Sequence, residues 1–121
     1  MPLKKEEVRK ITKALGMIET RGLATSIEVA DAMLKNANVQ LVNQSMVDAA
    51  LVTIVVEGDV SAVQAAVETG TKIAERVGAL ISYNVIPHPD SSIRSLVEKI
   101  DKQVEKDVNE ELINDKPNNA E

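Results

Sequence analysis

The side chains that could do chemistry are few and lie far apart in the sequence. His88 is the single histidine, it stands between Pro87 and Pro89, and the chain has no cysteine. A protein zinc site takes three or four His, Cys or acidic ligands, so one histidine without a second His or Cys does not complete one. We therefore expect no metal site and place His88 in a loop or an interface. A role as a ligand or general base is the alternative.

Nucleophiles and phosphate-binding loops have little more support in the sequence. Ser45, Ser91 and Ser92 lack a convincing base and orienting acid around them, and Ser91 and Ser92 are typical of a helix start. The five glycines form neither of the common nucleotide-binding patterns, G-x-G-x-x-G and G-x-x-x-x-G-K-[ST]. The acidic residues are interpreted as solvated helix faces; they include Glu6–Glu7, Glu28 with Asp31, and Glu110–Glu111. This inventory favours a scaffold or binding module over an enzyme, and it implies no cofactor.

Composition narrows the class of protein further. The chain has 121 residues, 44% hydrophobic and 27% charged, which fits one globular domain. Tyr83 is the one aromatic residue and the net charge is −5, so the sequence offers neither a stacking platform for bases nor clustered cations for phosphates. The sequence has no run of 18 apolar residues and no secretory signal at its start. We expect a soluble cytoplasmic protein that binds neither nucleic acid nor membranes.

Charge divides the chain into three parts. Residues 1–14 carry a net +3, residues 15–97 a net −4, and residues 98–121 a net −4. The middle part holds nearly all of the apolar sequence. We therefore predict a short charged extension over residues 1–13, the domain over residues 14–97, and an acidic helical extension with a disordered end over residues 98–121.

Hydrophobic spacing predicts the elements of this domain. Strands are expected at residues 14–19, 39–42, 51–56 and 79–86, with the second and third pairing antiparallel across a connecting segment, Asn43 to Ala50. Helices are expected at residues 23–34 and 60–76, the latter capped by the Asp59 carboxylate and ended by Gly78. The order β-α-β-β-α-β predicts a ferredoxin-like sandwich of the α/β (α+β) class.

Two further helices are expected outside this sandwich. One begins at Asp90 or Ser91 and docks on the domain or on a partner; its apolar stripe consists of Ile93, Leu96, Val97, Ile100, Val104, Val108 and Leu112. The other is a short amphipathic helix near the start of the chain, with Leu3, Val8 and Ile11 among Lys and Glu. Residues 114–121 are polar and are expected to be disordered.

Five blocks of this sequence resemble a known family, in its order and spacing. They are Leu15–Leu23 (LGMIETRGL), Ala30–Val39 (ADAMLKNANV), Gly58–Val60 (GDV), Ala74–Gly78 (AERVG) and Val85–Pro87 (VIP). Over about Ala14 to Leu96 the chain is similar to the bacterial microcompartment shell proteins of the type with a single BMC domain. The resemblance implies a structural protein without catalysis, located in the microcompartment shell. Its homo-hexamers would tile edge to edge with other shell proteins around encapsulated enzymes.

The resemblance also implies two sets of site residues. Lys35 matches the family's edge lysine, and Asn38 matches the accompanying edge asparagine, with a helix-terminal lysine near the helix dipole as the alternative for Lys35. A departure lies at His88, where the family commonly has an arginine in Pro-Arg-Pro-His and this chain has Pro87-His88-Pro89-Asp90. Histidine cannot reproduce the arginine fork, so we expect weaker, differently curved or pH-dependent tiling.

The pore loop departs further from the family pattern. The family often has Lys-Ile-Gly-Ser-Gly where this chain has Met46, Val47, Asp48, Ala49 and Ala50, so two glycines are lost. If Asp48 faced the axis of a hexamer, six carboxylates would favour cations over anions. If Asp48 instead formed the turn, methyl groups of Ala49 would leave the opening nearly neutral.

One alternative belongs to a different class of function. A ferredoxin-like fold also suits a small-molecule-binding regulatory domain, which would bind its ligand saturably between subunits and remain a discrete oligomer. Extended hexagonal arrays would distinguish a shell protein from such a domain.

Overall fold

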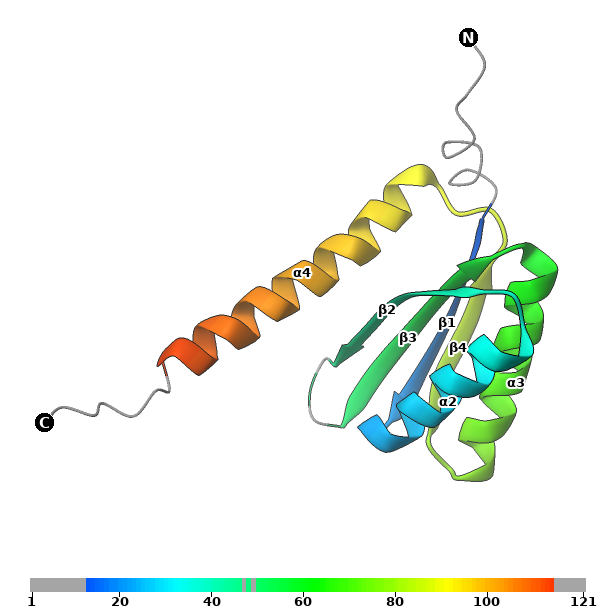
Figure 1. Ribbon diagram of the computed structural model, residues 1–121, viewed down its shortest axis with the longest axis horizontal. Coiled ribbons are helices and arrows are strands. Elements are labelled where there is room, and N and C mark those ends of the chain that lie inside the picture. The colour runs from blue at the N-terminus through cyan, green and yellow to red at the C-terminus, as the bar shows by residue number, and fades with distance from the viewer. Residues whose placement is uncertain (1–12, 47, 49, 115–121) are drawn as a thin grey trace, which may run out of the picture.

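The computed structural model describes residues 13–46, 48 and 50–114. Its elements, in chain order, are β1 (Ala14–Arg21), α2 (Leu23–Asn36), β2 (Gln40–Met46), β3 (Leu51–Gly58), α3 (Val60–Arg76), β4 (Leu80–Ile86) and α4 (Ser91–Asn114). Figure 1 shows this arrangement. The expected β-α-β-β-α-β order with an added C-terminal helix is confirmed. The short helix expected near Leu3 and the end of the chain from residue 115 lie outside the described residues.

The four strands form one antiparallel sheet in the order β2-β3-β1-β4. Ile18 at the middle of β1 lies opposite Ile54 in β3 and Tyr83 in β4. Alternate residues of a strand point to opposite faces. Ala14, Ile18 and Thr20 are separated by even numbers of residues, so they point to the same face of the sheet. All three are buried there beneath α2 and α3.

Valine, isoleucine, alanine and methionine fill the core between the sheet and the two helices, as the lack of aromatic residues requires. The fully buried side chains include Ile18, Val29, Met33, Ile54, Val56 and Val63. Helix α3 approaches β1 so closely that a Cβ atom on Gly16 would lie 2.7 Å from both Val63 Cγ1 and Val67 Cγ2. The glycine in β1 therefore sets the distance between the sheet and α3.

Strand β2 is longer than its sequence pattern predicts. Asn43, Gln44 and Ser45 were expected in the connecting segment because they are polar, but β2 continues to Met46, which pairs with Val52. The physical reason is that the polar side chains of this edge strand form hydrogen bonds with α4 and α2, which hold it against β3. Asn43 Nδ2 donates to the Val97 carbonyl oxygen at 3.4 Å, and Gln44 Nε2 donates to Ser26 Oγ at 3.1 Å.

The helix ends confirm two of the three expected caps. Gly78 has a φ of 70°, the left-handed conformation that ends α3. Asp90 Oδ1 accepts hydrogen bonds from Ser92 Oγ at 2.7 Å and from Ser92 N at 2.9 Å at the start of α4. These two bonds, the hydroxyl first, lower the pKa of Asp90. Asp59 lies at the N-cap of α3, but the expected carboxylate bond was wrong. Within the described residues only its backbone carbonyl is used, accepting from Val63 N at 2.9 Å.

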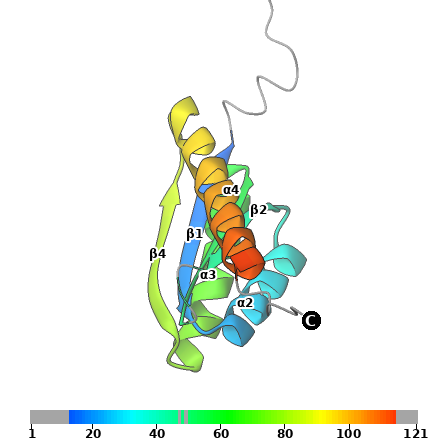
Figure 2. The same cartoon turned by 90° about the vertical axis from the view of Figure 1, so that its left-hand side faces the viewer.

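Helix α4 lies on the side of the sheet away from α2 and α3 (Figures 1 and 2). It contacts β2 near its start and then diverges from the domain. It is continuous across the boundary expected between residues 97 and 98, and it includes Asn114, which was wrongly assigned to the disordered end. None of the helices in the described ranges is long and apolar enough to cross a lipid bilayer.

Candidate functional site

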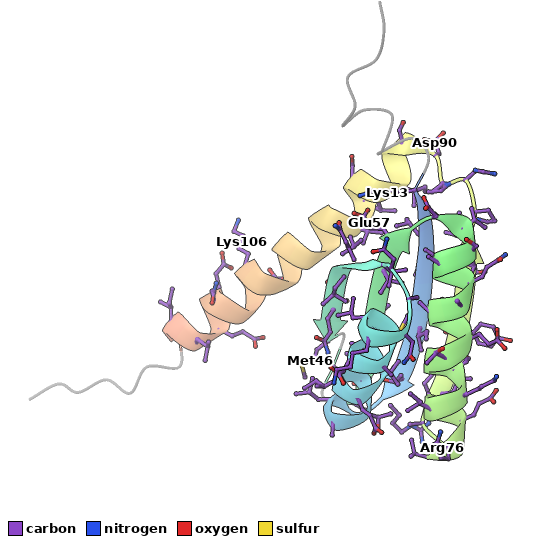
Figure 3. All side chains as sticks on the ribbon, turned by 45° about the vertical axis from the view of Figure 1, so that its right-hand side comes forward. Lys13, Met46, Glu57, Arg76, Asp90 and Lys106 are labelled. Carbon is purple, nitrogen blue, oxygen red and sulfur yellow. The ribbon has the colours of Figure 1, made fainter. Side chains whose placement is uncertain are left out.

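The topology separates the candidate edge residues from the candidate pore loop. At one end of the sheet, the start of β1 lies beside the last residues of β3 and β4. Helix α2 ends there too, and we call this end of the domain the Lys35 end. The connection between β2 and β3 lies at the opposite end, which we call the Asp48 end. In Figure 3, Lys13, Glu57 and Asp90 lie at the first of these ends, and Met46 and Arg76 lie at the second.

Lys35 occupies the last turn of α2 and points into solvent. Its Nζ lies 2.9 Å from Asp31 Oδ2, one turn earlier, and 73% of its side chain is exposed. An exposed ion pair of this kind contributes little to folding because water solvates both partners. The Lys35 ammonium is therefore available to carbonyl oxygens on another molecule at little cost.

Asn38 lies in the turn between α2 and β2, and its side chain is exposed. The turn is held by Val39 N donating to the Ala37 carbonyl oxygen at 2.9 Å. It packs directly on Gly58, where an added Cβ would lie 3.1 Å from the Asn38 carbonyl oxygen. The lack of a side chain at Gly58 therefore lets the turn at Asn38 pack directly against the end of β3.

His88 is exposed between β4 and α4, at the same end of the sheet. Across the described ranges, no hydrogen bond or ion pair joins it to Lys35 or Asn38. The fold thus brings the three expected edge residues to one end of the domain without connecting them.

Asp48 forms a turn, which is the second of the two expected arrangements. Its Oδ1 accepts hydrogen bonds from Ala50 N at 2.7 Å and Leu51 N at 3.0 Å. Ala50 is fixed in addition by its carbonyl oxygen, which accepts from Gly22 N at 2.6 Å. Of the other expected pore residues, Met46 is the last residue of β2, and Val47 and Ala49 lie outside the described residues.

Comparison with known proteins identifies the domain that carries these two ends. The family model described as the BMC domain matches residues 14–89. The chain belongs to the BMC-domain family. The bacterial microcompartment shell protein PduA of Citrobacter freundii is 46% identical over 87 residues, which are 72% of this chain and 94% of that protein. The shell protein EutM of Escherichia coli K12 is 46% identical over 84 residues, covering 69% and 87% of the two chains.

A solved structure supports the same family. A microcompartment protein from Desulfitobacterium hafniense DCB superposes with a TM-score of 0.61 at 32% identity. The similarity covers 65% of this chain and 43% of that one. The part matched to the BMC domain begins with β1 and ends immediately before α4.

The Lys35 end of the sheet also holds a partly buried ion pair that sequence analysis missed. Lys13 Nζ lies 3.3 Å from Glu57 Oε1, and only 6% of the Glu57 side chain is exposed. Glu57 pairs with Leu15 across β1 and β3, on the sheet face opposite the core. The available signal was the charge of Glu57 within the β-branched run of β3, together with a lysine directly before β1.

Two hollows on the surface bear on a small-molecule alternative. One, of about 290 Å³, lies on the sheet face opposite α2 and α3 and includes Glu19, Ser82 and Asn84. The other, of about 280 Å³, lies between α3 and β4 and includes Lys72 and Tyr83. Both are shallow and open, and in the part of the chain described here no three acidic or histidine side chains are grouped to bind a metal.

Proposed function

We propose that this protein is a structural shell protein of a bacterial microcompartment. Its copies close into cyclic homo-hexamers, the hexamers tile edge to edge with other shell proteins, and the central opening passes small metabolites. It acts without catalysis and without a cofactor, and it encloses enzymes of the compartment. The observation that carries this proposal is the 46% identity to PduA over nearly the whole of that shell protein.

The separation of the two ends of the domain supports this role. Tiling needs polar groups at the perimeter that can bind another copy, and Lys35, Asn38 and His88 meet that need at one end. A pore needs a compact loop that several copies can bring together, and the turn made by Asp48 supplies it at the other end. The topology lets one copy serve both contacts at once.

Electron microscopy and solution mass together test this function. We expect a particle of six times the 13.1 kDa chain mass and, at higher concentration, sheets or tubes with hexagonal order. A single-chain mass at high concentration with no lateral association would overturn the proposal. Saturable binding of a small metabolite by a discrete oligomer would favour the regulatory alternative instead.

His88 replaces the arginine that is common at this edge in the family. Arginine presents a planar fork of donors that histidine cannot reproduce. We expect the His88→Arg variant to form several-fold more sheet than the wild type at the same protein concentration, measured by light scattering and microscopy. His88→Ala serves as the control and should not exceed the wild type, and equal assembly by the wild type and His88→Arg would contradict the prediction.

The turn made by Asp48 is expected to leave the opening nearly neutral. Replacing Asp48 with asparagine keeps the Oδ1 acceptor for Ala50 N and Leu51 N but removes the charge. Because the Asp48 carboxylate accepts hydrogen bonds within its own turn, we predict that Asp48→Asn changes the entry of a small anion into assembled shells by less than about twofold. A neutral solute of the same size serves as the control. If the anion enters several-fold faster through Asp48→Asn shells while the neutral solute is unchanged, a ring of carboxylates faces the path.

A further inference from the structure

Strand β4 has an open outer edge. It is the last strand in the sheet order β2-β3-β1-β4, and Figure 2 shows no described element beyond it. Residues 81–84 are exposed, Tyr83 by 59%. Edge strands usually avoid pairing with other chains through charged residues, proline or a covering element. The strand, LISYNVI, contains neither a charge nor a proline, so its edge is open to another strand.

The backbone groups of Tyr83 and Val85 point to this outer edge. Arg21 N donates to the Ala79 carbonyl oxygen at 2.8 Å, so the odd-numbered residues of β1 bond to β4, where they lie opposite even-numbered residues. The backbone groups of successive residues in a strand point to opposite sides. The odd-numbered residues of β4 therefore point outward. Val85 N fits this arrangement, because it donates to the side-chain Oδ1 of Asn84 at 2.9 Å.

The sequence of β4 is nearly symmetric about Tyr83. In an antiparallel pair of two copies centred there, Ser82 of one copy lies opposite Asn84 of the other, and Ile81 lies opposite Val85. Polar residues thus meet polar residues and apolar residues meet apolar ones, which stabilises cross-strand pairs. The register shift between β1 and β4 lies at the start of β4, away from the centre of this match. The strand is therefore complementary to itself.

Helix α3 carries charges with the same symmetry. A Cβ atom on Gly70 would lie 2.5 Å from Ile18 Cδ1, and Ile18 pairs with Tyr83, so residue 70 is level with Tyr83. Glu68 and Lys72 lie two residues to either side of it and border the same hollow of about 280 Å³ as Tyr83. A two-fold axis at Tyr83 turns Glu68 of each copy toward Lys72 of the other. The charges on the two flanks are therefore complementary.

We propose that β4 pairs antiparallel with β4 of a second copy of this chain, about a two-fold axis at Tyr83. The pair joins two four-stranded sheets into one sheet of eight strands. The N–H and carbonyl groups of Tyr83 bond to the same groups of the other copy. The same surface serves both copies, so the contact closes at two chains. This dimer goes beyond the proposed shell function and does not depend on it.

The dimer and the proposed hexamer are separate states of the chain. An antiparallel pair places the Asp48 end of one copy beside the Lys35 end of the other. A hexamer with its pore at the Asp48 ends instead gathers those ends around one axis. Chains held in the dimer are therefore withheld from ring assembly by mass action.

Disulfide trapping tests the pair directly, since the chain has no cysteine of its own. Opposed residues that exchange both backbone bonds have Cα atoms about 5.5 Å apart, which suits a disulfide. The full-length Tyr83→Cys chain is refolded at low concentration and treated with copper phenanthroline. We expect about fivefold or more covalent dimer than from Ile27→Cys. Ile27 lies on α2 and is 54% exposed, close to the 59% of Tyr83.

Charges placed beside the cysteine give a second readout. In the Tyr83→Cys chain, Ser82→Lys with Asn84→Asp sets opposite charges across the axis and should preserve trapping. Ser82→Lys with Asn84→Lys sets like charges there and should reduce trapping about threefold or more. Both side chains are exposed, so we expect the two variants to have the same circular dichroism spectrum.

Three results would overturn the β4 dimer as described. They are equal trapping by Tyr83→Cys and Ile27→Cys, equal trapping by the two charge variants, and trapped dimers that remain inside six-copy particles. Wild-type hexamers and hexagonal arrays without trapping by Tyr83→Cys would contradict the dimer alone. Trapping by Tyr83→Cys, with no wild-type hexamers at high concentration, would contradict the shell function alone.

Discussion

Replacing Lys35 with alanine is expected to abolish hexagonal sheets while leaving the hexamer and its thermal stability unchanged. Within one chain, Lys35 makes only the exposed pair with Asp31, so its removal costs the fold little. At an edge between hexamers the ammonium would donate to carbonyl oxygens of the neighbouring copy. Each loss of about 1.4 kcal/mol of binding free energy lowers the association constant of one edge contact tenfold. Because one hexamer binds its neighbours through several edges at once, these factors multiply.

The chain provides a matched control for this variant. Lys72 pairs with Glu68 at 3.2 Å with the same spacing of four residues, and its side chain is 71% exposed, close to the 73% of Lys35. Lys72→Ala therefore removes an equivalent helix pair and an equal charge from α3. Sheets are measured by microscopy and scattering, hexamer mass by ultracentrifugation. If Lys72→Ala abolishes the sheets as fully as Lys35→Ala, or if Lys35→Ala still tiles, Lys35 is not the edge residue.

Replacing Gly16 with alanine is expected to lower the free energy of unfolding by about 1–3 kcal/mol, the usual cost of overpacking a core. The new Cβ would lie 2.7 Å from Val63 Cγ1 and from Val67 Cγ2. A valine in a helix has one strongly preferred rotamer, so neither side chain can turn away and α3 must shift. This cost outweighs the gain of about 0.4–1 kcal/mol that a Gly→Ala change gives through the unfolded chain.

A second substitution distinguishes this clash from a general loss of packing. Val67→Ala removes one of the two methyl contacts, so the double variant Gly16→Ala/Val67→Ala should be more stable than the sum of the two single effects allows. Urea unfolding at one fixed protein concentration measures all four chains, because association adds to apparent stability. A Gly16→Ala variant as stable as the wild type would show that β1 and α3 can separate freely.

Much of the fold follows from local spacing in the sequence. The bounds of α3 match its apolar periodicity between Asp59 and Gly78, and β1 and β3 match their expected ranges within two residues. The extension of β2 through Asn43 and Gln44 could not be predicted, because those polar residues are ordered by partners in α4 and α2 that local pattern does not reveal. The same holds for Lys13 with Glu57, which are 44 residues apart.

The candidate site shows a similar division. The resemblance named Lys35, Asn38 and His88, and topology explains why one end of the domain carries all three. Sequence alone left two orientations open for Asp48, since a carboxylate can face an axis or accept from its own turn. The choice depends on whether Ala50 N and Leu51 N come within reach, which depends on the pairing of Leu51 with Arg21.

The length of the antiparallel strands also keeps charges at the Lys35 end and the Asp48 end too far apart to interact. Eight residues of β1 or β3 span about 26 Å, more than three screening lengths at physiological salt, where the Debye length is about 8 Å. A charge altered in the loop near Asp48 is therefore not felt at Lys35. Under the proposed roles of these two ends, we therefore expect substitutions that change the permeability of a tile to leave its compatibility with its neighbours intact.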